Sequence, residues 1–297
     1  MLSILIPTHN YTCYKLVADL HQQGEALGVP YEIIVCEDGS RDSVSIIANH
    51  KIEELSNCRH IINKQNIGPA ATRNLLAKNA LYDWVVFIDC DAQVIHDDFL
   101  ANYINNVGKN DVVVGGLQHP RHNDDPNRTL RFKYETEADK TRGAKFRNQN
   151  PYNKFSTFNF MVRRSVFLCI LFDENCKQYG YEDALFGLEL KRRGISILHI
   201  DNPLLHTGID TNKAFLQKTE TALNTLLSLR NRMQGGSALL NMYARFSRRR
   251  SVWLLRLNYS LFGGIMRRNL LSAHPSLTVF NFYKLCYYAN LDQYLVR

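Results

Sequence analysis

The chain lacks the sequence patterns that mark several common protein classes. Its seven cysteines are odd in number, scattered and never spaced as Cys-x-x-Cys. We therefore expect neither a disulfide framework nor a zinc site, and a reducing cytosol is the expected compartment. No Gly-x-Gly-x-x-Gly follows the first apolar run, and no Gly-x-x-x-x-Gly-Lys-Ser/Thr occurs anywhere. These absences argue against a Rossmann dinucleotide site and against a P-loop.

The sequence also shows no signal peptide and no membrane-spanning segment. Its first residues carry no basic stretch and read directly into a strand, so we expect no signal peptide. The longest apolar candidate is residues 252–266, and Arg256 interrupts it. That segment falls short of the roughly 20 apolar residues that a helical span requires.

Acidic residues are missing from one long stretch. Residues 221–291 contain no Asp or Glu and ten Lys or Arg, whereas residues 1–220 carry 25 basic and 27 acidic side chains. The formal net charge of +8 is therefore concentrated near the C-terminus. This asymmetry indicates a polyanionic partner for the C-terminal region alone.

Short apolar runs alternate with segments of helical periodicity over the first 120 residues. Continuous apolar strands separated by helices predict a mostly parallel sheet with helices on both faces. Residues 118–155 are polar and without a clear period, which favours a long binding loop. Strands are expected at 2–6, 32–36, 59–63, 84–88, 111–114, 158–162 and 195–200, and helices at 13–27, 42–55, 69–80, 97–106, 182–193 and over most of the remainder.

Chemically apt side chains follow several of these strands. Asp38 follows the second strand, Asp89 and Asp91 follow the strand at 84–88, and His206 follows the strand at 195–200. Open parallel sheets bind their ligands at the carboxyl ends of the strands. We therefore expect these side chains to meet at one edge of the sheet.

The pair Asp89 and Asp91 has two interpretations. Alternate residues of an extended chain point to the same side, so both carboxylates can face one site. A divalent cation would relieve their repulsion and could bridge a diphosphate. A solvated turn at the start of a helix is the competing interpretation, and the spacing alone does not decide between them.

Five motifs in order resemble the family 2 glycosyltransferases of the GT-A fold. Each is weak alone, but their order and spacing together are specific, and the resemblance covers about residues 1–210. The motifs are SILIPTHN at 3–10, VCEDGS at 35–40, NIGPAATRN at 66–74, DCD at 89–91 and GYED at 180–183, with His206 downstream.

The resemblance implies both an architecture and an activity. It implies a GT-A catalytic domain over residues 1–215, and the charge pattern adds a basic amphipathic helical region over 216–297. The implied activity moves a sugar from a nucleotide-diphosphate sugar, with a UDP-sugar favoured, to a hydroxyl of a glycan or lipid-linked acceptor. Such enzymes serve the synthesis of bacterial surface polysaccharides.

The resemblance also assigns the donor side of the site. Many relatives carry tyrosine where this chain has His9, so the identity of the base is less firmly implied than the rest. Pro7, Thr8 and His9 would line the base pocket, Asp38 would hydrogen-bond the base, Arg73 would support the nucleotide, Asp89 and Cys90 would lie near the ribose, and Asp91 and His206 would bind Mn²⁺ or Mg²⁺.

Glu182 and Asp183 are the implied acceptor-side residues. Acidic residues also favour a helix N-terminus through the dipole, by about 0.3–1 kcal/mol, so their position has a purely structural interpretation as well. In the functional interpretation, Asp183 takes the proton of the attacking hydroxyl and Glu182 hydrogen-bonds the acceptor sugar. A single base opposite the leaving diphosphate implies one direct displacement with inversion.

Residues 242–271 intersperse arginines with tryptophan, leucine and phenylalanine. A basic amphipathic helix of this kind suits an anionic membrane surface, which predicts peripheral binding on the cytoplasmic face. Packing on the catalytic domain and an oligomer contact remain open alternatives. No nucleic-acid-binding motif accompanies the charge, so we expect no nucleic acid partner.

Two other function classes compete with glycosyl transfer. A sugar nucleotidyltransferase would share the sheet type, but it usually has a Gly-rich basic loop after the first strand, where this chain has residues 7–10 as PTHN. A non-catalytic nucleotide-sugar-binding protein would not need Asp89, Asp91, Asp183 and His206 together.

Overall fold

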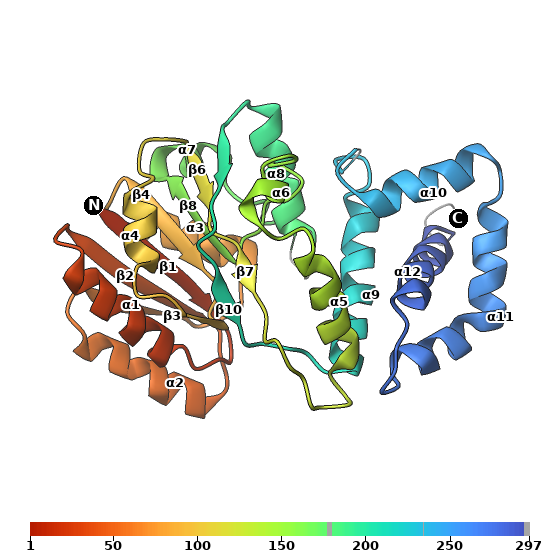
Figure 1. Ribbon diagram of the computed structural model, residues 1–297, viewed down its shortest axis with the longest axis horizontal. Coiled ribbons are helices and arrows are strands. Elements are labelled where there is room, and N and C mark those ends of the chain that lie inside the picture. Colours follow the sequence, from red (N-terminus) through yellow and green to blue (C-terminus); the bar gives the residue numbers. More distant parts are fainter. Residues whose placement is uncertain (177–179, 234, 294–297) are drawn as a thin grey trace. The chain divides into compact units, whose positions relative to one another are not determined.

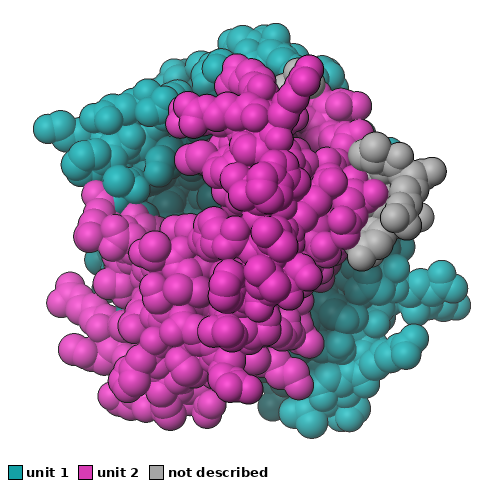
Figure 2. Space-filling model, turned by 90° about the vertical axis from the view of Figure 1, so that its right-hand side faces the viewer, with its two compact units in different colours: residues 1–120, 141–177, 186–208 teal, residues 121–140, 178–185, 209–297 magenta. Residues whose placement is uncertain are grey.

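The computed structural model describes residues 1–176, 180–233 and 235–293. The chain divides into two compact units. The first comprises residues 1–120, 141–177 and 186–208, and the second comprises 121–140, 178–185 and 209–297 (Figure 2). The boundaries of these units differ from the single boundary at residue 215 that the sequence suggested. Residues 294–297 of the expected helical region lie outside the described residues.

A seven-stranded sheet forms the centre of the first unit (Figure 1). Its order is β3-β2-β1-β4-β8-β6-β9, and β8 pairs antiparallel with both of its neighbours while the other pairs are parallel. All seven strands were expected from the sequence. Their bounds are β1 Leu2–Thr8, β2 Tyr31–Asp38, β3 Cys58–Asn63, β4 Trp84–Ile88, β6 Val112–Val114, β8 Asn159–Arg163 and β9 Ile197–His199.

The sheet is buried on both faces because its strands are apolar at successive positions. In β1, Ile4 packs into one core together with Leu20 of α1, whereas Leu5 packs into a second core together with Leu76 of α3. The helices of this unit are α1 Tyr14–Ala26, α2 Ser43–His50, the 3₁₀ turn η1 Lys51–Glu54, α3 Pro69–Asn79, α4 Phe99–Ile104, α6 Ala144–Arg147 and α7 Arg164–Ile170. Helix α8, Glu182–Arg192, begins in the second unit and ends in the first.

A second, three-stranded sheet lies in the first unit and was not expected from the sequence. Its order is β5-β10-β7, with β5 at Ala92–Gln93, β7 at Leu117–Gln118 and β10 at Leu204–His206. These strands have two or three residues and, unlike β6 and β9, do not lie within a longer apolar run that the sequence reveals. This small sheet positions His206, as described below.

The second unit is helical, as expected for the C-terminal region. Its core includes Leu216 of α9, Leu255 and Leu270 of α11, and Phe280 and Cys286 of α12. Its helices are α5 Thr129–Asp139, α9 Asn212–Ser228, α10 Ala238–Arg248, α11 Val252–Leu270 and α12 Leu277–Asp292.

The expectation of an irregular loop over residues 118–155 is wrong, because α5 and α6 lie there. Helix α5 escaped sequence analysis because only Leu130 and Glu135 of it are buried, and one of these is charged. Arg131 compensates the charge of Glu135, with Nη2 of the arginine 2.5 Å from Oε1 of the glutamate. Tertiary contacts, rather than an apolar stripe, therefore stabilise this helix.

A single helix over residues 242–271 is likewise wrong, since α10 and α11 are separate. Arg250 has a φ of +53°. Its N–H bonds the carbonyl of Ser247, and the N–H of Ser251 bonds the carbonyl of Phe246. This is the hydrogen-bond pattern of a Schellman helix end, with arginine at the left-handed position where glycine is usual. In the described parts of the chain, no helix has both the length and the apolar character to cross a bilayer.

Candidate active site

Asp91 and His206 meet because of a strand pairing. Strand β10 runs antiparallel to β5 with His206 opposite Ala92, the residue after Asp91. As a result, Oδ2 of Asp91 and Nε2 of His206 lie 3.0 Å apart. The hydroxyl and the N–H of Thr207 both donate to the carbonyl of Asp91, at 2.8 and 3.0 Å. The backbone on both sides of the pair is therefore fixed.

The surroundings of this pair fit a divalent cation. A carboxylate oxygen and an imidazole nitrogen converge, and both are accepted ligands of Mn²⁺. Nδ1 of His206 is buried and has no hydrogen-bond partner among the described residues. The ring of Phe158 stands edge-on to that imidazole, with the two ring centroids 5.4 Å apart, and this contact restricts rotation of the imidazole. Asp91 and His206 are thus the residues that could hold Mn²⁺ or Mg²⁺.

Gly208 leaves the space beside the carboxylate open. A Cβ placed at this position would lie 2.4 Å from Oδ2 of Asp91. On the sequence-based prediction that Asp91 binds Mn²⁺, we expect Gly208→Ala to displace that carboxylate and to weaken Mn²⁺-dependent binding of a nucleoside diphosphate at least about tenfold. The fold should persist, because the displaced atom ends a side chain that is not fully buried. Titration of nucleoside diphosphate with and without Mn²⁺ measures the effect, and unchanged Mn²⁺-dependent affinity would contradict it.

Asp89 is held by a buried arginine. Nη2 of Arg73, on α3, donates to Oδ1 of Asp89 at 2.5 Å, and Arg73 is 4% exposed. The N–H of Asp89 also bonds the carbonyl of Phe158. A buried guanidinium needs a partner charge, so Asp89 and Arg73 depend on each other. The sequence placed both near the nucleotide, and the structure brings them together.

Asp38 organises the loop that precedes α3. Its carboxylate accepts hydrogen bonds from the N–H groups of Ile67 at 2.8 Å and Gly68 at 2.9 Å. A carboxylate has about four acceptor positions, so these bonds leave capacity for a ligand. The predicted contact of Asp38 with a base is compatible with this arrangement and stays a prediction. Gly39 follows with a φ of +64°, and a Cβ there would lie 2.2 Å from the backbone nitrogen of Asn66.

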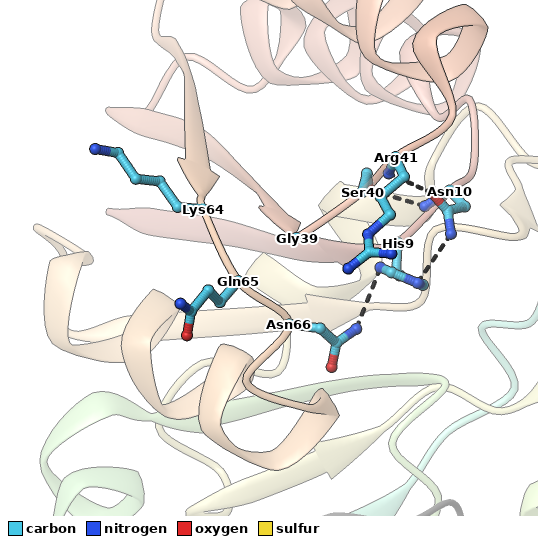
Figure 3. A pocket seen from close by; sticks show the side chains of 8 residues that line it. All are labelled: His9, Asn10, Gly39, Ser40, Arg41, Lys64, Gln65 and Asn66. Carbon is cyan, nitrogen blue, oxygen red and sulfur yellow. Dashed lines mark hydrogen bonds between the residues drawn. The ribbon is translucent and has the colours of Figure 1, made fainter.

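A polar pocket of about 520 Å³ opens at the carboxyl ends of β1, β2 and β3 (Figure 3). His9 points into it, and its Nδ1 bonds the carbonyl of Asp38 at 2.8 Å. The amide of Asn10 bonds Nε2 of the same ring at 2.9 Å. The sequence assigned a role only to His9 among the lining side chains, although the others also follow strand ends. They are Asn10, Gly39, Ser40, Arg41, Lys64, Gln65 and Asn66.

The remaining donor-side residues are less accessible. Thr8 is 3% exposed and its hydroxyl donates to the carbonyl of Tyr11. Pro7 lies within β1, opposite Cys36 of β2. Cys90 lines a smaller pocket of about 180 Å³. Burial, with a contribution from the charge of Asp91, raises the pKa of the Cys90 thiol to about 12, so the thiol stays protonated.

Glu182 and Asp183 begin α8 and belong to the second unit, whereas Asp91 and His206 belong to the first. Oε2 of Glu182 accepts from the N–H of Gly180 at 3.0 Å, and Oδ1 of Asp183 accepts from the N–H of Ala184 at 2.6 Å. Tyr181, just before them, has a φ of +66°. A left-handed tyrosine is strained, and such strain is concentrated at functional sites.

The chain is similar in sequence to known glycosyltransferases. The chain is 31% identical over 105 residues to an uncharacterized glycosyltransferase of Haemophilus influenzae, which covers 34% of this chain and 38% of that one. It is 24% identical over 244 residues to a chondroitin synthase of Escherichia coli, which covers 69% of this chain and 34% of the synthase. The chain therefore spans about a third of the length of these relatives.

Solved structures share its fold. A mannosyltransferase from Pyrobaculum calidifontis in complex with GDP-Man and Mn²⁺ aligns with 99% of this chain and 86% of its own, at a TM-score of 0.63 and 13% identity. Residues 1–349 of S. aureus TarS, in complex with UDP, align with 100% of this chain, and the alignment covers 92% of the TarS chain. The TM-score is 0.51 and the sequence identity is 16%. These neighbours confirm the GT-A architecture. The family model for glycosyl transferase family 2 matches residues 3–171, which is more than half of this chain, so the chain belongs to that family.

Proposed function

We propose that this glycosyltransferase moves a sugar from a nucleoside-diphosphate sugar to a hydroxyl of a glycan or lipid-linked acceptor, with inversion and with Mn²⁺ or Mg²⁺ bound. The convergence of Asp91 and His206 at 3.0 Å carries this proposal. The ion, when bound by these two residues, would supply positive charge to the leaving diphosphate. Relatives that include chondroitin and hyaluronan synthases make polysaccharide synthesis the natural setting.

We propose that the nucleotide base binds in the polar pocket. His9 offers a flat ring, and Asn10 and Asn66 offer amide groups, which are typical donors and acceptors for a base edge. Arg41 and Lys64 add positive charge suited to a nucleotide. A uridine nucleotide is our preferred donor, since the resemblance assigns a uracil contact to Asp38.

Asp183 is the proposed general base. It accepts the proton of the acceptor hydroxyl while that oxygen forms its bond to the anomeric carbon. The bond from that carbon to the diphosphate oxygen breaks in the same step, and the nucleoside diphosphate leaves with the electron pair. A positioned base contributes roughly 10²–10⁴-fold, because a sugar hydroxyl is a weak nucleophile at neutral pH. Glu182 hydrogen-bonds the acceptor sugar and fixes its orientation.

A thermal-shift screen tests the donor assignment. Nucleoside diphosphates of all common bases are added with Mn²⁺, Mg²⁺ or EDTA, since a ligand that binds only the folded protein raises its melting temperature. The proposal requires that one diphosphate, preferably UDP, raises the melting temperature with metal and much less with EDTA. An absence of any metal-dependent shift across the set would contradict it.

The C-terminal helices offer a surface for a membrane. Helix α11 is apolar on two sides: Leu255, Met266 and Leu270 face the core, while a second set of apolar residues is exposed. Trp253 is 59% exposed and Ile265 is 67% exposed. The exposed set is Trp253, Leu254, Leu257, Leu261, Phe262 and Ile265.

Arginines flank this exposed face. Arg248, Arg249 and Arg250 lie exposed at the junction of α10 and α11, and none of them forms an ion pair with a carboxylate within the described residues. Exposed apolar side chains beside uncompensated arginines are the features of an interfacial membrane helix. We therefore include an anionic membrane surface among the partners of this protein.

Replacing Arg248, Arg249 and Arg250 by glutamine is expected to weaken binding to vesicles of anionic phospholipid. At about 1 kcal/mol per arginine near an anionic surface, the partition coefficient should fall on the order of 100-fold. Glutamine at Lys78, Lys109 and Lys145 removes the same charge from the first unit and should change binding little. Co-sedimentation with vesicles measures both. Equal retention on neutral vesicles would contradict the electrostatic part of the proposal.

A further inference from the structure

Three potential metal ligands other than Asp91 and His206 converge on the first unit. His50 ends α2, Glu53 lies in η1, and His60 lies in β3. One ligand atom of each can be chosen so that no two are more than 4.8 Å apart. Nδ1 of His50 and Oε2 of Glu53 are 3.5 Å apart. Two ligands bound tetrahedrally to zinc at about 2.0–2.1 Å are separated by about 3.3–3.4 Å, so this pair already has a suitable spacing.

His60 is the unusual member of the three. Its side chain is 0% exposed, and neither ring nitrogen has a hydrogen-bond partner among the described residues. Buried polar atoms nearly always have a partner, since each unsatisfied one costs free energy. Among the described residues, Nε2 of this ring approaches Oε1 of Glu37 at 3.7 Å, which is too long for a hydrogen bond. A ligand that requires a bare imidazole nitrogen would satisfy it.

We propose that His50, Glu53 and His60 bind a zinc ion. Two imidazoles and one carboxylate form a donor set that zinc accepts and that Mg²⁺ and Ca²⁺ do not favour. His50 and Glu53 are exposed, so the ion can enter from solvent and keep water as its fourth ligand. The sequence argument against zinc concerned cysteines, and no cysteine takes part in this site. The site does not depend on the proposed function.

The neighbouring Glu37 links this site to the polar pocket. Its buried carboxylate accepts hydrogen bonds from Asn49 of α2 at 2.6 Å and from the hydroxyl of Ser40. That hydroxyl in turn accepts from the N–H of Asn10 at 2.8 Å. Ser40 and Asn10 both line the pocket. An ion that fixes His60 against Glu37 therefore also stabilises the pocket wall. Charged partners of the ligating carboxylate and imidazoles are the usual outer shell of a metal site.

The test measures zinc binding in the Asp91→Ala background, in which the proposed metal site of Asp91 and His206 is removed. Equilibrium dialysis against Zn²⁺, with bound metal quantified by mass spectrometry, should show one equivalent of tightly bound zinc per chain. His50→Ala and Glu53→Gln, both at exposed side chains, should each weaken that equivalent at least about tenfold. Zinc should also raise the melting temperature of the background protein and not that of the His50→Ala protein.

His21→Ala is the matched control. His21 and Glu25 form a similar helical pair, with Nε2 and Oε1 at 3.8 Å, but no third ligand completes a cluster with them in the described chain. This variant should retain the tight equivalent. The proposal is overturned if the background protein binds no tight zinc, or if His50→Ala binds it as tightly as the background. His60 would then be a histidine paired with Glu37 alone.

Discussion

Asp183→Asn should reduce the rate of sugar transfer by roughly 10²–10⁴-fold, the usual contribution of a general base. Asparagine matches aspartate in size but cannot accept the proton of the acceptor hydroxyl. Oδ1 of Asp183 accepts the N–H of Ala184 at 2.6 Å, and the amide oxygen of asparagine can replace it. The start of α8 should therefore remain intact. The loss should appear in kcat, measured by release of nucleoside diphosphate with a supplied acceptor.

Glu182→Gln is the comparison for this variant. It lies one residue away and carries the same charge, but we assign it to acceptor binding, so it should raise the KM for the acceptor more than it lowers kcat. Both variants should bind nucleoside diphosphate with nearly the affinity of the unmodified protein. Full activity of Asp183→Asn would remove the base from the mechanism, whereas lost nucleotide binding would point to a disturbed fold.

Asp91→Ala should abolish the metal-dependent part of donor binding. The side chain supplies one of the two proposed ligands, and losing a ligand should cost at least the 10–100-fold that supporting groups of metal sites contribute. Turnover should fall with it, because the diphosphate would lose its compensating charge. Titration calorimetry with nucleoside diphosphate, in Mn²⁺ and in EDTA, measures the binding, and the same preparations report turnover.

Asp97→Ala is the control for Asp91→Ala, since it removes an exposed carboxylate six positions further along the chain. It should leave binding and turnover unchanged. EDTA should reduce the unmodified protein to the level of Asp91→Ala and should have little further effect on that variant. Turnover of the unmodified protein that persists in EDTA would rule out the metal in this reaction.

The fold was largely predictable because its strands contain short continuous apolar runs. In β2 residues 33–36 read IIVC, and a short apolar run of this kind is typical of a buried strand in a parallel sheet. The start of α3 was predictable from Pro69, which stands at its first turn. Such local signals do not depend on distant contacts. They are therefore readable from the sequence alone.

The missing elements depend on contacts that the sequence does not display. Helix α5 buries the charged Glu135, which pairs with the half-buried Arg131, and an apolar pattern cannot register this. The break at Arg250 uses a left-handed arginine where glycine would have been the signal. The strand β10 has three residues, and its pairing with β5 determines where His206 lies.

The sequence named the candidate residues of the site but not their geometry. Motif order named Asp91 and His206, but the antiparallel register that brings them together came from the structure. Arg73 was named for the nucleotide, and the structure shows that it holds Asp89. The roles of Glu182 and Asp183 stay predictions, because they belong to a different unit from Asp91 and His206.

On our proposal, Asp91 and His206 together hold the ion that binds the donor diphosphate. Anomalous diffraction at the manganese edge, from crystals grown with Mn²⁺ and the nucleoside diphosphate of largest thermal shift, tests it most directly. We predict one strong peak within bonding distance of Oδ2 of Asp91, Nε2 of His206 and the diphosphate. A diphosphate-bound manganese that touches neither side chain would contradict the account.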